Sequence, residues 1–385
     1  MNKPTTMPKP RLLYVSRSRI PSDQANCVQV LKMCAGIAAY AEVELAAPYF
    51  RPDACQGNTL AERFALARPF PVHWLTYPHL GNRFAVRGYA LAAVAYARLQ
   101  GFRLAYTRDP WAAYWLARSG IRTGFESHDL KEDRRYPIWQ TLVSDPSLSP
   151  ALRGVFCITR RLLDDSIAAG ARENILHVAP DGVDLQRFQN PLSKADARRA
   201  LNLPEGGRWI VHAGHLYEGR GGEELVQSLA QLPGARLLFA GGKPADVERV
   251  RAVAAREGLA ERVRFEGMVP NGRIPLYLWA ADVLAMPYTS RTPIIASISP
   301  MKMFEYMAAQ RPIVSTDFPT LREVLRDGEN AILVAPDNPA ALAAGIRRVL
   351  EDEAFAGRIS RQARADVEPF SWDRRAEKIL GILTG

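Results

Sequence analysis

The chain has 385 residues, of which 48% are apolar and 23% charged, and its net charge is +10. This length predicts two domains or one large one, and this balance is typical of a globular protein with a full core. The longest apolar stretch, 88–97, is bounded by Arg87 and Arg98. It falls short of the roughly 18–20 residues that span a bilayer, so we expect no membrane-spanning helix.

The N-terminal segment and the cysteines bear on the compartment. Residues 1–10 are polar with no apolar core behind them, which argues against a signal peptide. Cys27, Cys34, Cys55 and Cys157 form no Cys-x-x-Cys pair. They fit free buried thiols in a reducing cytoplasm better than a disulfide frame or a zinc site. We therefore expect a cytoplasmic protein.

The positive charge is unevenly distributed. Residues 1–185 contain 23 Lys and Arg against 16 Asp and Glu. A basic half predicts an anionic partner, which is a phosphorylated substrate, an acidic membrane surface or nucleic acid. Because no Lys/Arg run, nucleic-acid motif or aromatic-basic repeat is present, we expect no nucleic-acid partner.

The first half of the chain alternates strand and helix patterns. Run 11–16 predicts a buried strand, 28–40 a helix and 43–47 the next strand. Strand–helix–strand at this spacing indicates a parallel sheet. Shorter strands that fit the same scheme are expected at 104–106, 123–125, 154–158 and 175–178.

After a turn-rich stretch at 181–191 the alternation restarts. Strands are expected at 209–212, 236–240, 263–265, 283–286, 312–315 and 331–334. Helices are expected at 222–232, 247–257, 273–280 and 301–309. The predicted fold class is α/β, with two Rossmann-like parallel-sheet domains facing a central cleft, and ligands are expected beyond the carboxyl ends of the strands.

The segment that starts at Ser299 is the most informative. Ser299 is a good N-cap and Pro300 a good first helical residue. Free amides at the helix start, including that of Met301, suit a diphosphate, and Lys302 adds a full charge. Glu305 lies on the same face, where a carboxylate suits ribose hydroxyls. The alternative is a capped helix with a surface Lys–Glu pair.

A glycine-rich loop follows the strand at 209–212. Gly214 and its neighbouring glycines let the backbone approach a phosphate, and Arg220 adds a bidentate donor. His215 stands in the same loop. The loop is neither a Walker loop nor a dinucleotide fingerprint, so a plain turn is the alternative.

Two features stand in the basic half. His128 ends a predicted strand, where it would donate to a substrate hydroxyl or shuttle a proton; the alternative is a structural histidine. It has too few ligand neighbours for zinc. In the predicted helical segment 82–103, Arg83, Arg87 and Arg98 project within roughly 60° of each other, a face that suits anionic lipid or plain solvation.

In order, several segments together resemble the group-1 family of retaining glycosyltransferases, which has the GT-B fold of the glycogen-synthase-like superfamily. The matching segments are 179–188, 214–222, 238–242, 265–269, 281–288, 299–308, 311–317, 323–328 and 370–372. The resemblance covers most of residues 11–385. It implies an acceptor-binding domain at 1–187, a donor-binding domain at 188–367 and a C-terminal helix at 368–385 that crosses back to the first domain.

The resemblance also implies residue roles. Glu305 matches the glutamate that holds the nucleotide ribose, Arg220 the cation that clamps the diphosphate, and His128 a histidine near the donor sugar. The loop at 17–26 lies where the family places its acceptor. The full set of implied site residues is His128 and Arg220 as catalytic, Gly214, His215, Arg220, Ser299, Pro300, Met301, Lys302 and Glu305 for the donor, and Arg17, Arg19 and Arg108 on the acceptor side.

Three positions depart from the family pattern. Ser297 replaces a first glutamate, His215 replaces an arginine, and no Gly-Gly pair stands in the loop at 17–26. A family branch that reads Ser-Pro-x-Lys-x-Phe-Glu matches this chain, so we interpret Ser297 as subgroup variation. The charge of His215 would depend on pH.

The expected function is sugar transfer from a nucleotide diphosphate sugar, UDP- or GDP-linked, to a sugar, glycan, lipid-linked or phosphorylated acceptor. Because no Asp-x-Asp motif is present, Arg220, Lys302 and the helix start would replace a divalent metal, and no cofactor is expected. The alternatives are a nucleotide-sugar 2-epimerase and a degenerate nucleotide-sugar-binding subunit. A peripheral contact of the protein with the anionic inner face of the membrane is a further alternative.

Overall fold

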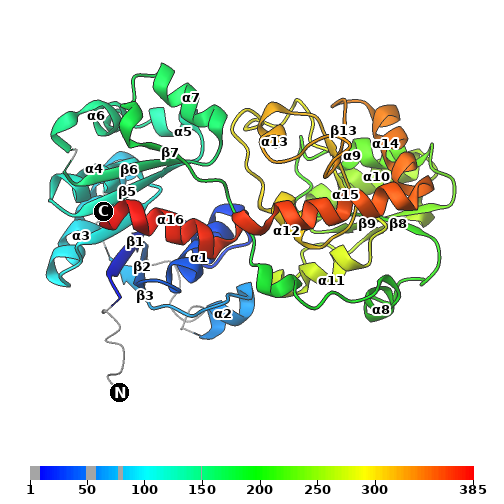
Figure 1. The fold of residues 1–385 in the computed structure, drawn as a ribbon, viewed down its shortest axis with the longest axis horizontal. Helices are drawn as coiled ribbons and strands as arrows, with labels where there is room; N and C mark the ends of the chain where they lie inside the picture. The colour runs from blue at the N-terminus through cyan, green and yellow to red at the C-terminus, as the bar shows by residue number, and fades with distance from the viewer. Residues whose placement is uncertain (1–8, 49–57, 77–80, 149) are drawn as a thin grey trace. The chain divides into compact units, whose positions relative to one another are not determined.

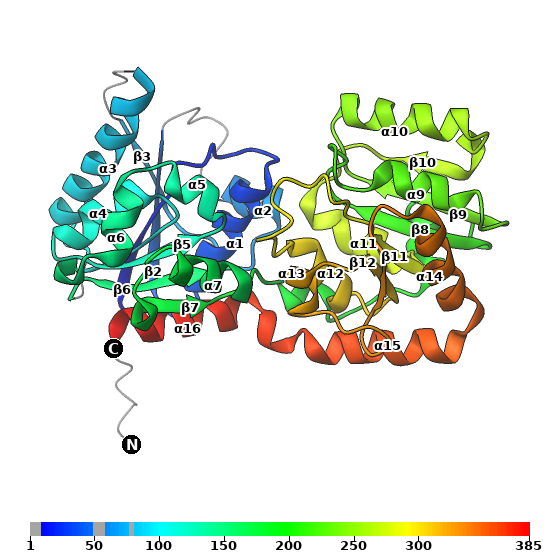
Figure 2. The same ribbon diagram turned by 90° about the horizontal axis from the view of Figure 1, so that it is seen from above.

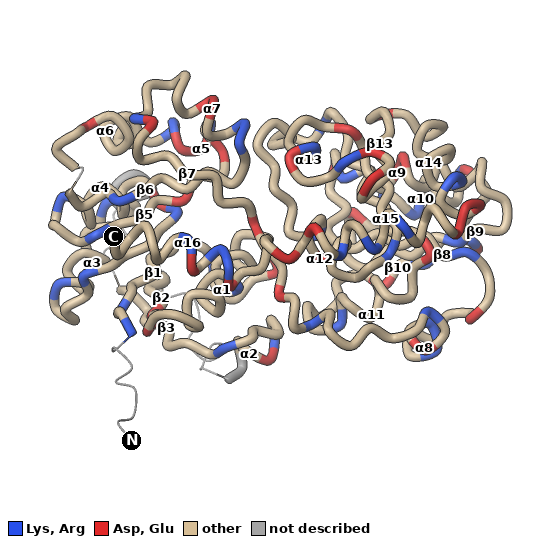
Figure 3. Tube along the Cα trace, viewed as in Figure 1, with Lys and Arg blue, Asp and Glu red and all other residues tan. Residues whose placement is uncertain are grey.

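The computed structural model describes residues 9–48, 58–76, 81–148 and 150–385. Cys55 and the side chain of Arg83 lie outside the described residues. The chain forms two compact units, Met1–Asp181 with Trp372–Gly385, and Gly182–Ser371. Each unit contains one parallel sheet (Figure 1). Figure 3 shows basic and acidic residues interspersed along both traces.

The first unit has a seven-stranded sheet in the order β3-β2-β1-β4-β5-β6-β7. Its strands are β1 Arg11–Val15, β2 Glu42–Pro48, β3 Val72–Leu75, β4 Leu104–Thr107, β5 Arg122–Ser127, β6 Leu152–Cys157 and β7 Leu176–Val178. Its α-helices are α1 Ala25–Ile37, α2 Asn58–Phe64, α3 Gly81–Leu99, α4 Pro110–Arg118, α5 Leu130–Arg134, α6 Ile138–Ser144, α7 Arg160–Ala168 and α16 Trp372–Thr384.

Alternating side chains of β1 separate the two faces of this sheet. Leu13 and Val15 pack into the cluster that α3 and α4 complete. Tyr14, on the opposite face, lies near Cys34 of α1 and Arg375 of α16. The last helix therefore belongs to the first unit, where it lies beside α1 (Figure 1).

The second unit has a six-stranded sheet in the order β10-β9-β8-β11-β12-β13, which the strand labels of Figure 2 follow from β10 to β12. The strands are β8 Arg208–Ala213, β9 Ala235–Ala240, β10 Val263–Phe265, β11 Val283–Met286, β12 Ile313–Thr316 and β13 Ile332–Val334. The helices are α8 Lys194–Ala200, α9 Gly222–Leu229, α10 Pro244–Arg256, α11 Ile274–Trp279, α12 Met301–Ala308, α13 Pro319–Arg322, α14 Pro339–Glu351 and α15 Glu353–Asp366. One apolar cluster lies under α9, α10 and α14, and another under α8, α11 and α12.

The boundary between the units differs from the predicted one. We expected divisions after residues 187 and 367, whereas the structure places them after Asp181 and Ser371. Val183 and Phe188 belong to the core of the second unit, and the amide of Val183 donates to Phe370 O at 2.9 Å. The two connecting segments are thus paired inside the second unit.

One predicted element needed correction, and one observed strand was not predicted. The helix expected at 82–103 ends at Leu99, because the chain turns at Gly101, which has φ of 72°. Strand β3 was not expected, because its three half-buried residues and one buried residue, including a histidine, make no apolar run. Within the described ranges no helix is long and apolar enough to cross a membrane. Cys27, Cys34 and Cys157 are free and buried.

Candidate functional site

The start of α12 differs by one residue from the prediction. Pro300, with φ of −78° and ψ of 123°, is the N-cap, and Met301 is the first helical residue. The prediction of Ser299 as N-cap was therefore wrong; Ser299 is buried in the extended segment before the helix. Pro300 tolerates this position because its ring fixes φ near the observed value and an N-cap needs no amide donor. The amide of Met303 donates back to Pro300 O at 2.9 Å. The amides of Met301 and Lys302 precede it in the first turn of the helix, where amides have no partner within the helix.

Lys302 points back against the glycine loop. A Cβ atom at Gly214 would lie 2.9 Å from Lys302 Nζ, so the ammonium group lies directly against the backbone of this glycine. The same Nζ lies 3.2 Å from His212 Nε2 and 5.4 Å from the ring centre of Tyr288. Glu305 instead pairs with Arg187 at 3.5 Å. The alternative of a surface Lys–Glu pair is therefore wrong.

His212 orients this lysine. Its Nδ1 lies 3.0 Å from Ala285 O, and since a carbonyl only accepts, Nδ1 must carry the proton. Burial, and then Lys302, hold the pKa of His212 well below its usual value, so the ring is neutral. Its Nε2 therefore accepts a hydrogen bond from Lys302. Sequence reasoning had placed His212 only as a strand residue.

Arg220 lies near the same aromatic ring. Its guanidinium carbon is 5.0 Å from the centre of Tyr288 and 4.4 Å from that of Tyr217. Its Nε is buried and has no hydrogen-bond partner among the described residues. The next residue, Gly221, has φ of 76°, and a Cβ there would meet Pro287 O at 1.6 Å. The glycine is thus required for the turn that presents Arg220.

The site has a surplus of positive charge. Burial, and then the neighbouring Arg220, lower the pKa of Lys302 well below its usual value, although Glu305 acts in the opposite direction. In the part of the chain that the structure describes, neither Lys302 nor Arg220 has a carboxylate within ion-pair distance. A half-buried arginine, a lysine whose protonated form an anion would favour and a helix N-terminus together form a site for an anion with more than one charge.

Hydrogen bonds tie the helix and the loop together. Ala213 N donates to the hydroxyl of Tyr306 at 2.8 Å, which fixes α12 to the end of β8. His215 follows Gly214 directly, and its ring lies 5.9 Å from that of Tyr217. The structure therefore brings Gly214, Arg220, Lys302 and the start of α12 to one place. Tyr288 and Arg187 were not predicted, because they lie in segments whose proximity only the fold creates.

Comparisons with known proteins bear on the family and the fold of the chain. Residues 207–352 match the family described as Glycosyl transferases group 1. The chain contains a group 1 glycosyltransferase domain. The chain is 31% identical over 252 residues to a D-inositol 3-phosphate glycosyltransferase of Xylanimonas cellulosilytica, which covers 63% of this chain and 59% of that protein.

Other similar proteins include a lipid-modifying enzyme and two solved structures. The phosphatidyl-myo-inositol mannosyltransferase of Mycobacterium tuberculosis is 31% identical over 212 residues, covering 53% of this chain and 52% of that protein. The chain thus spans less than two thirds of the length of these relatives. Sucrose-phosphate synthase from Thermosynechococcus elongatus superposes with a TM-score of 0.80 at 20% identity, over 98% of both chains. Anabaena HepE in complex with UDP gives 0.77 at 19% identity, over 97% of this chain and 99% of that one. The fold is GT-B, as the sequence predicted.

The donor residues predicted by resemblance lie in or beside the group 1 glycosyltransferase domain, whereas His128 lies in the first unit. His128 follows β5 and shares a hydrogen bond with the carboxylate of Glu126. Burial, and then Arg108, lower the pKa of His128 to about 4, against the influence of Glu126, so its ring is neutral. Among the described residues no group of three or more His, Cys, Asp or Glu side chains is placed to hold a metal ion.

The three acceptor-side arginines predicted outside the group 1 glycosyltransferase domain do not form one cluster. Arg17 donates to the carboxylate of Asp109 and to the hydroxyl of Tyr136, the latter at 2.8 Å. Arg108 donates to Gln29 Oε1 at 3.0 Å. Arg19 is exposed. Only Arg108 therefore joins the surroundings of His128.

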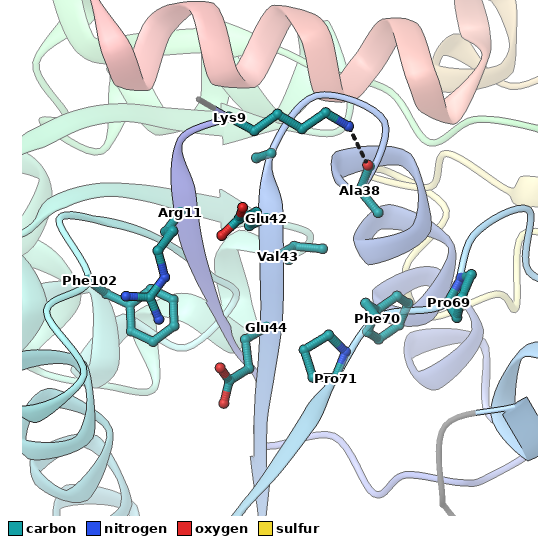
Figure 4. A pocket seen from close by; sticks show the side chains of 11 residues that line it. Lys9, Arg11, Ala38, Glu42, Val43, Glu44, Pro69, Phe70, Pro71 and Phe102 are labelled. Carbon is teal, nitrogen blue, oxygen red and sulfur yellow. Dashed lines mark hydrogen bonds between the residues drawn. The ribbon is translucent and has the colours of Figure 1, made fainter. Parts of the chain in front are cut away.

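The first unit has a hollow of about 410 Å³ (Figure 4). It lies at the end of the sheet opposite to the end from which His128 emerges. Arg11 and Glu42, the first residues of β1 and β2, line it, and Lys9 donates to Ala38 O at 3.4 Å beside it. Ligands of open parallel sheets bind beyond the carboxyl ends of the strands. This hollow is at the amino ends, so we do not assign the acceptor to it.

Proposed function

We propose that the protein is a glycosyltransferase that moves a sugar from a nucleotide diphosphate sugar to an acceptor hydroxyl. One observation carries this proposal. Lys302 and Arg220 converge on Tyr288 at the N-terminus of α12, and no described carboxylate neutralises them. A diphosphate supplies the missing negative charge. Glu305, held by Arg187 in the next turn of the helix, would accept hydrogen bonds from the ribose hydroxyls.

The proposed reaction retains the configuration of the anomeric carbon and needs no metal. The bond between the anomeric carbon and the phosphate oxygen breaks, and the acceptor oxygen bonds to the same face of that carbon. The acceptor proton passes to the departing phosphate oxygen. Arg220, Lys302 and the amides of α12 stabilise the negative charge that develops on the diphosphate, which is the contribution that a divalent cation makes elsewhere.

The nature of donor and acceptor is proposed from the similar proteins. HepE is known in complex with UDP and with UDP-glucose, which supports a nucleoside diphosphate sugar as donor. The relatives act, by their names, on inositol 3-phosphate and on phosphatidyl-myo-inositol. We therefore propose a phosphorylated or lipid-linked acceptor for this chain, in the cytoplasm or at the inner membrane face. The basic first half supports an anionic acceptor.

Replacing Arg220 tests the diphosphate clamp. Nucleoside diphosphate sugars are first screened by thermal shift, since a bound ligand raises the melting temperature by mass action. With the best donor, Arg220→Ala should lower turnover well beyond threefold. Arg236→Ala is the matched control, because Arg236 also lies over an aromatic ring, that of Trp209, but away from the site. Turnover of Arg220→Ala within threefold of the wild type, about 0.7 kcal/mol, would refute the clamp.

The same assay separates the alternatives. An epimerised donor formed without any acceptor indicates a nucleotide-sugar 2-epimerase. Tight nucleotide binding without turnover across many acceptors indicates a degenerate binding subunit. Transfer to a phosphorylated or lipid-linked acceptor, undiminished by a chelator, supports the proposal in full.

A further inference from the structure

The carboxylate of Glu126 is saturated with hydrogen bonds at the centre of the first unit. Its side chain is 1% exposed. Oε1 accepts from Gln29 Nε2 at 2.5 Å and from His128 Nε2, and Oε2 accepts from the hydroxyl of Tyr106 at 2.5 Å and from Arg375 Nη1 at 3.1 Å. Two donors on each oxygen fill the usual capacity of a carboxylate. Glu126 is thus fixed by groups from α1, β4, the end of β5 and α16.

Arg375 brings a charge from the last helix into this centre. Its side chain is 6% exposed, and it also donates to Pro180 O at 2.9 Å and to Ala179 O at 3.1 Å. Burial alone would raise the pKa of Glu126, but Arg375, followed by His128, brings that pKa well below its usual value. Glu126 is therefore an anion at neutral pH, and its oxygens only accept hydrogen bonds.

This anion determines which nitrogen of His128 carries the proton. Because Glu126 cannot donate, Nε2 of His128 must hold the hydrogen of their hydrogen bond. A neutral imidazole has a single N–H, so Nδ1 presents a lone pair. In the described part of the chain no group is recorded in a hydrogen bond with Nδ1, and the side chain of His128 keeps 20% of its surface exposed.

We propose that Glu126, held in place by Arg375 of the C-terminal helix, is a positioning residue that fixes His128 as the Nε2–H tautomer, so that Nδ1 accepts a hydrogen bond from a sugar hydroxyl. The proposal rests on the proposed glycosyl transfer. It reverses the direction expected from the sequence, in which His128 donates to the substrate. It also gives the last helix a part in the site of the first unit.

Histidine NMR tests this assignment independently of activity. Protein labelled with ¹⁵N at histidine shows the tautomer of each ring, and His128→Asn identifies the signals of His128. The wild type should show a protonated Nε2 and a bare Nδ1 at His128. In Glu126→Gln the amide can donate as well as accept, so the preference for this tautomer should be lost. Turnover should fall at least tenfold, while the dissociation constant of the nucleoside diphosphate without its sugar stays within about twofold, because the residues proposed to bind the diphosphate lie in the other unit.

A matched control separates the positioning of His128 by Glu126 from a general loosening of α16. Asp373 of α16 holds Arg68 through two hydrogen bonds of 2.8 and 2.9 Å and does not contact Glu126. Asp373→Asn should keep the tautomer and keep turnover within about twofold. Arg375→Lys, which retains the charge, should keep more turnover than Arg375→Met, and this pair decides the question if Glu126→Gln does not fold.

Two results would overturn the proposal. One is a protonated Nδ1 at His128 in the wild type. The other is a folded Glu126→Gln with the wild-type tautomer and turnover. If the tautomer is as stated but no nucleoside diphosphate sugar binds or reacts, the proposed function fails and the hydroxyl contact with it, whereas the positioning of His128 by Glu126 stands.

Discussion

In the protein without bound donor, the surroundings of Lys302 disfavour its protonated, charged form. Burial removes water from its ammonium group, Arg220 repels it, and His212 offers only a neutral acceptor. A bound diphosphate reverses this balance, because an opposite charge in contact favours the protonated form. Donor binding should therefore be accompanied by proton uptake at Lys302.

This linkage predicts a pH dependence of donor binding. The pKa of Lys302 is low in the free protein, and the bound diphosphate raises it. The protonated lysine therefore contributes fully to donor affinity when the pH is below its pKa in the free protein. This contribution is lost as the pH rises through its pKa in the complex. We expect the affinity for a nucleoside diphosphate sugar to fall as pH rises toward the usual pKa of a lysine, by at most about tenfold per pH unit for one proton. Titration calorimetry in buffers of different ionisation enthalpy measures both the affinity and the protons taken up.

Lys302→Met provides the control for this prediction. It should bind the donor more weakly and with no change in affinity over the same pH range. His215, which stands in the same loop, is tested with His215→Asn, which should keep the pH dependence. A wild-type affinity that stays flat from neutral pH up to the usual pKa of a lysine, without proton uptake, would contradict the linkage.

Among the secondary-structure elements, α1 and α16 of the first unit pack in close contact. A Cβ atom at Gly36 would lie 2.7 Å from the carbonyl oxygen of Trp372. The absence of a side chain at Gly36 lets the last helix lie against the first one. Arg375 starts from this same helix, so the packing at Gly36 also places the charge that reaches Glu126.

Substitution of Gly36 should therefore destabilise the protein. Gly36→Ala forces the backbone of α16 away, and we expect a loss of about 1–3 kcal/mol, the usual range for overpacking. Thermal or urea unfolding measures this loss. Gly381→Ala is the matched control within α16, since a Cβ there meets nothing within 4 Å and alanine favours a helix by up to about 1 kcal/mol. Equal stability of Gly36→Ala and wild type would show that the two helices have room to separate.

At the scale of the whole molecule, both units contain basic and acidic residues (Figure 3). Helix α3 contains arginines and no acidic residue. Arg87 and Arg98 are exposed on it, together with Leu91 at 51% and Leu99 at 83% exposure. Cations beside exposed leucines on one helix suit the surface of an anionic bilayer.

Vesicle binding tests this surface. The protein should sediment with vesicles that contain anionic lipid, and added salt should weaken the binding, because exposed charges are screened. Arg87→Glu with Arg98→Glu should abolish most of it. Arg161→Glu is the control, since Arg161 is an exposed arginine already paired with Asp165. Equal binding of the double variant and the control would exclude α3 as the contact.

The sequence by itself determined the two alternating blocks, the parallel sheets, the glycine loop with Arg220 and the helix that carries Lys302 and Glu305. These features are local, because periodicity, glycine positions and helix starts are set by neighbours along the chain. It erred at the cap of α12 by one residue, and it missed β3 and several helices, among them α4, α7, α14 and α15. Tertiary structure alone decided which side chains meet. His212 lies 90 positions from Lys302 and Glu126 lies 249 positions from Arg375, and only the packing of distant segments sets the charge and the tautomer of such groups.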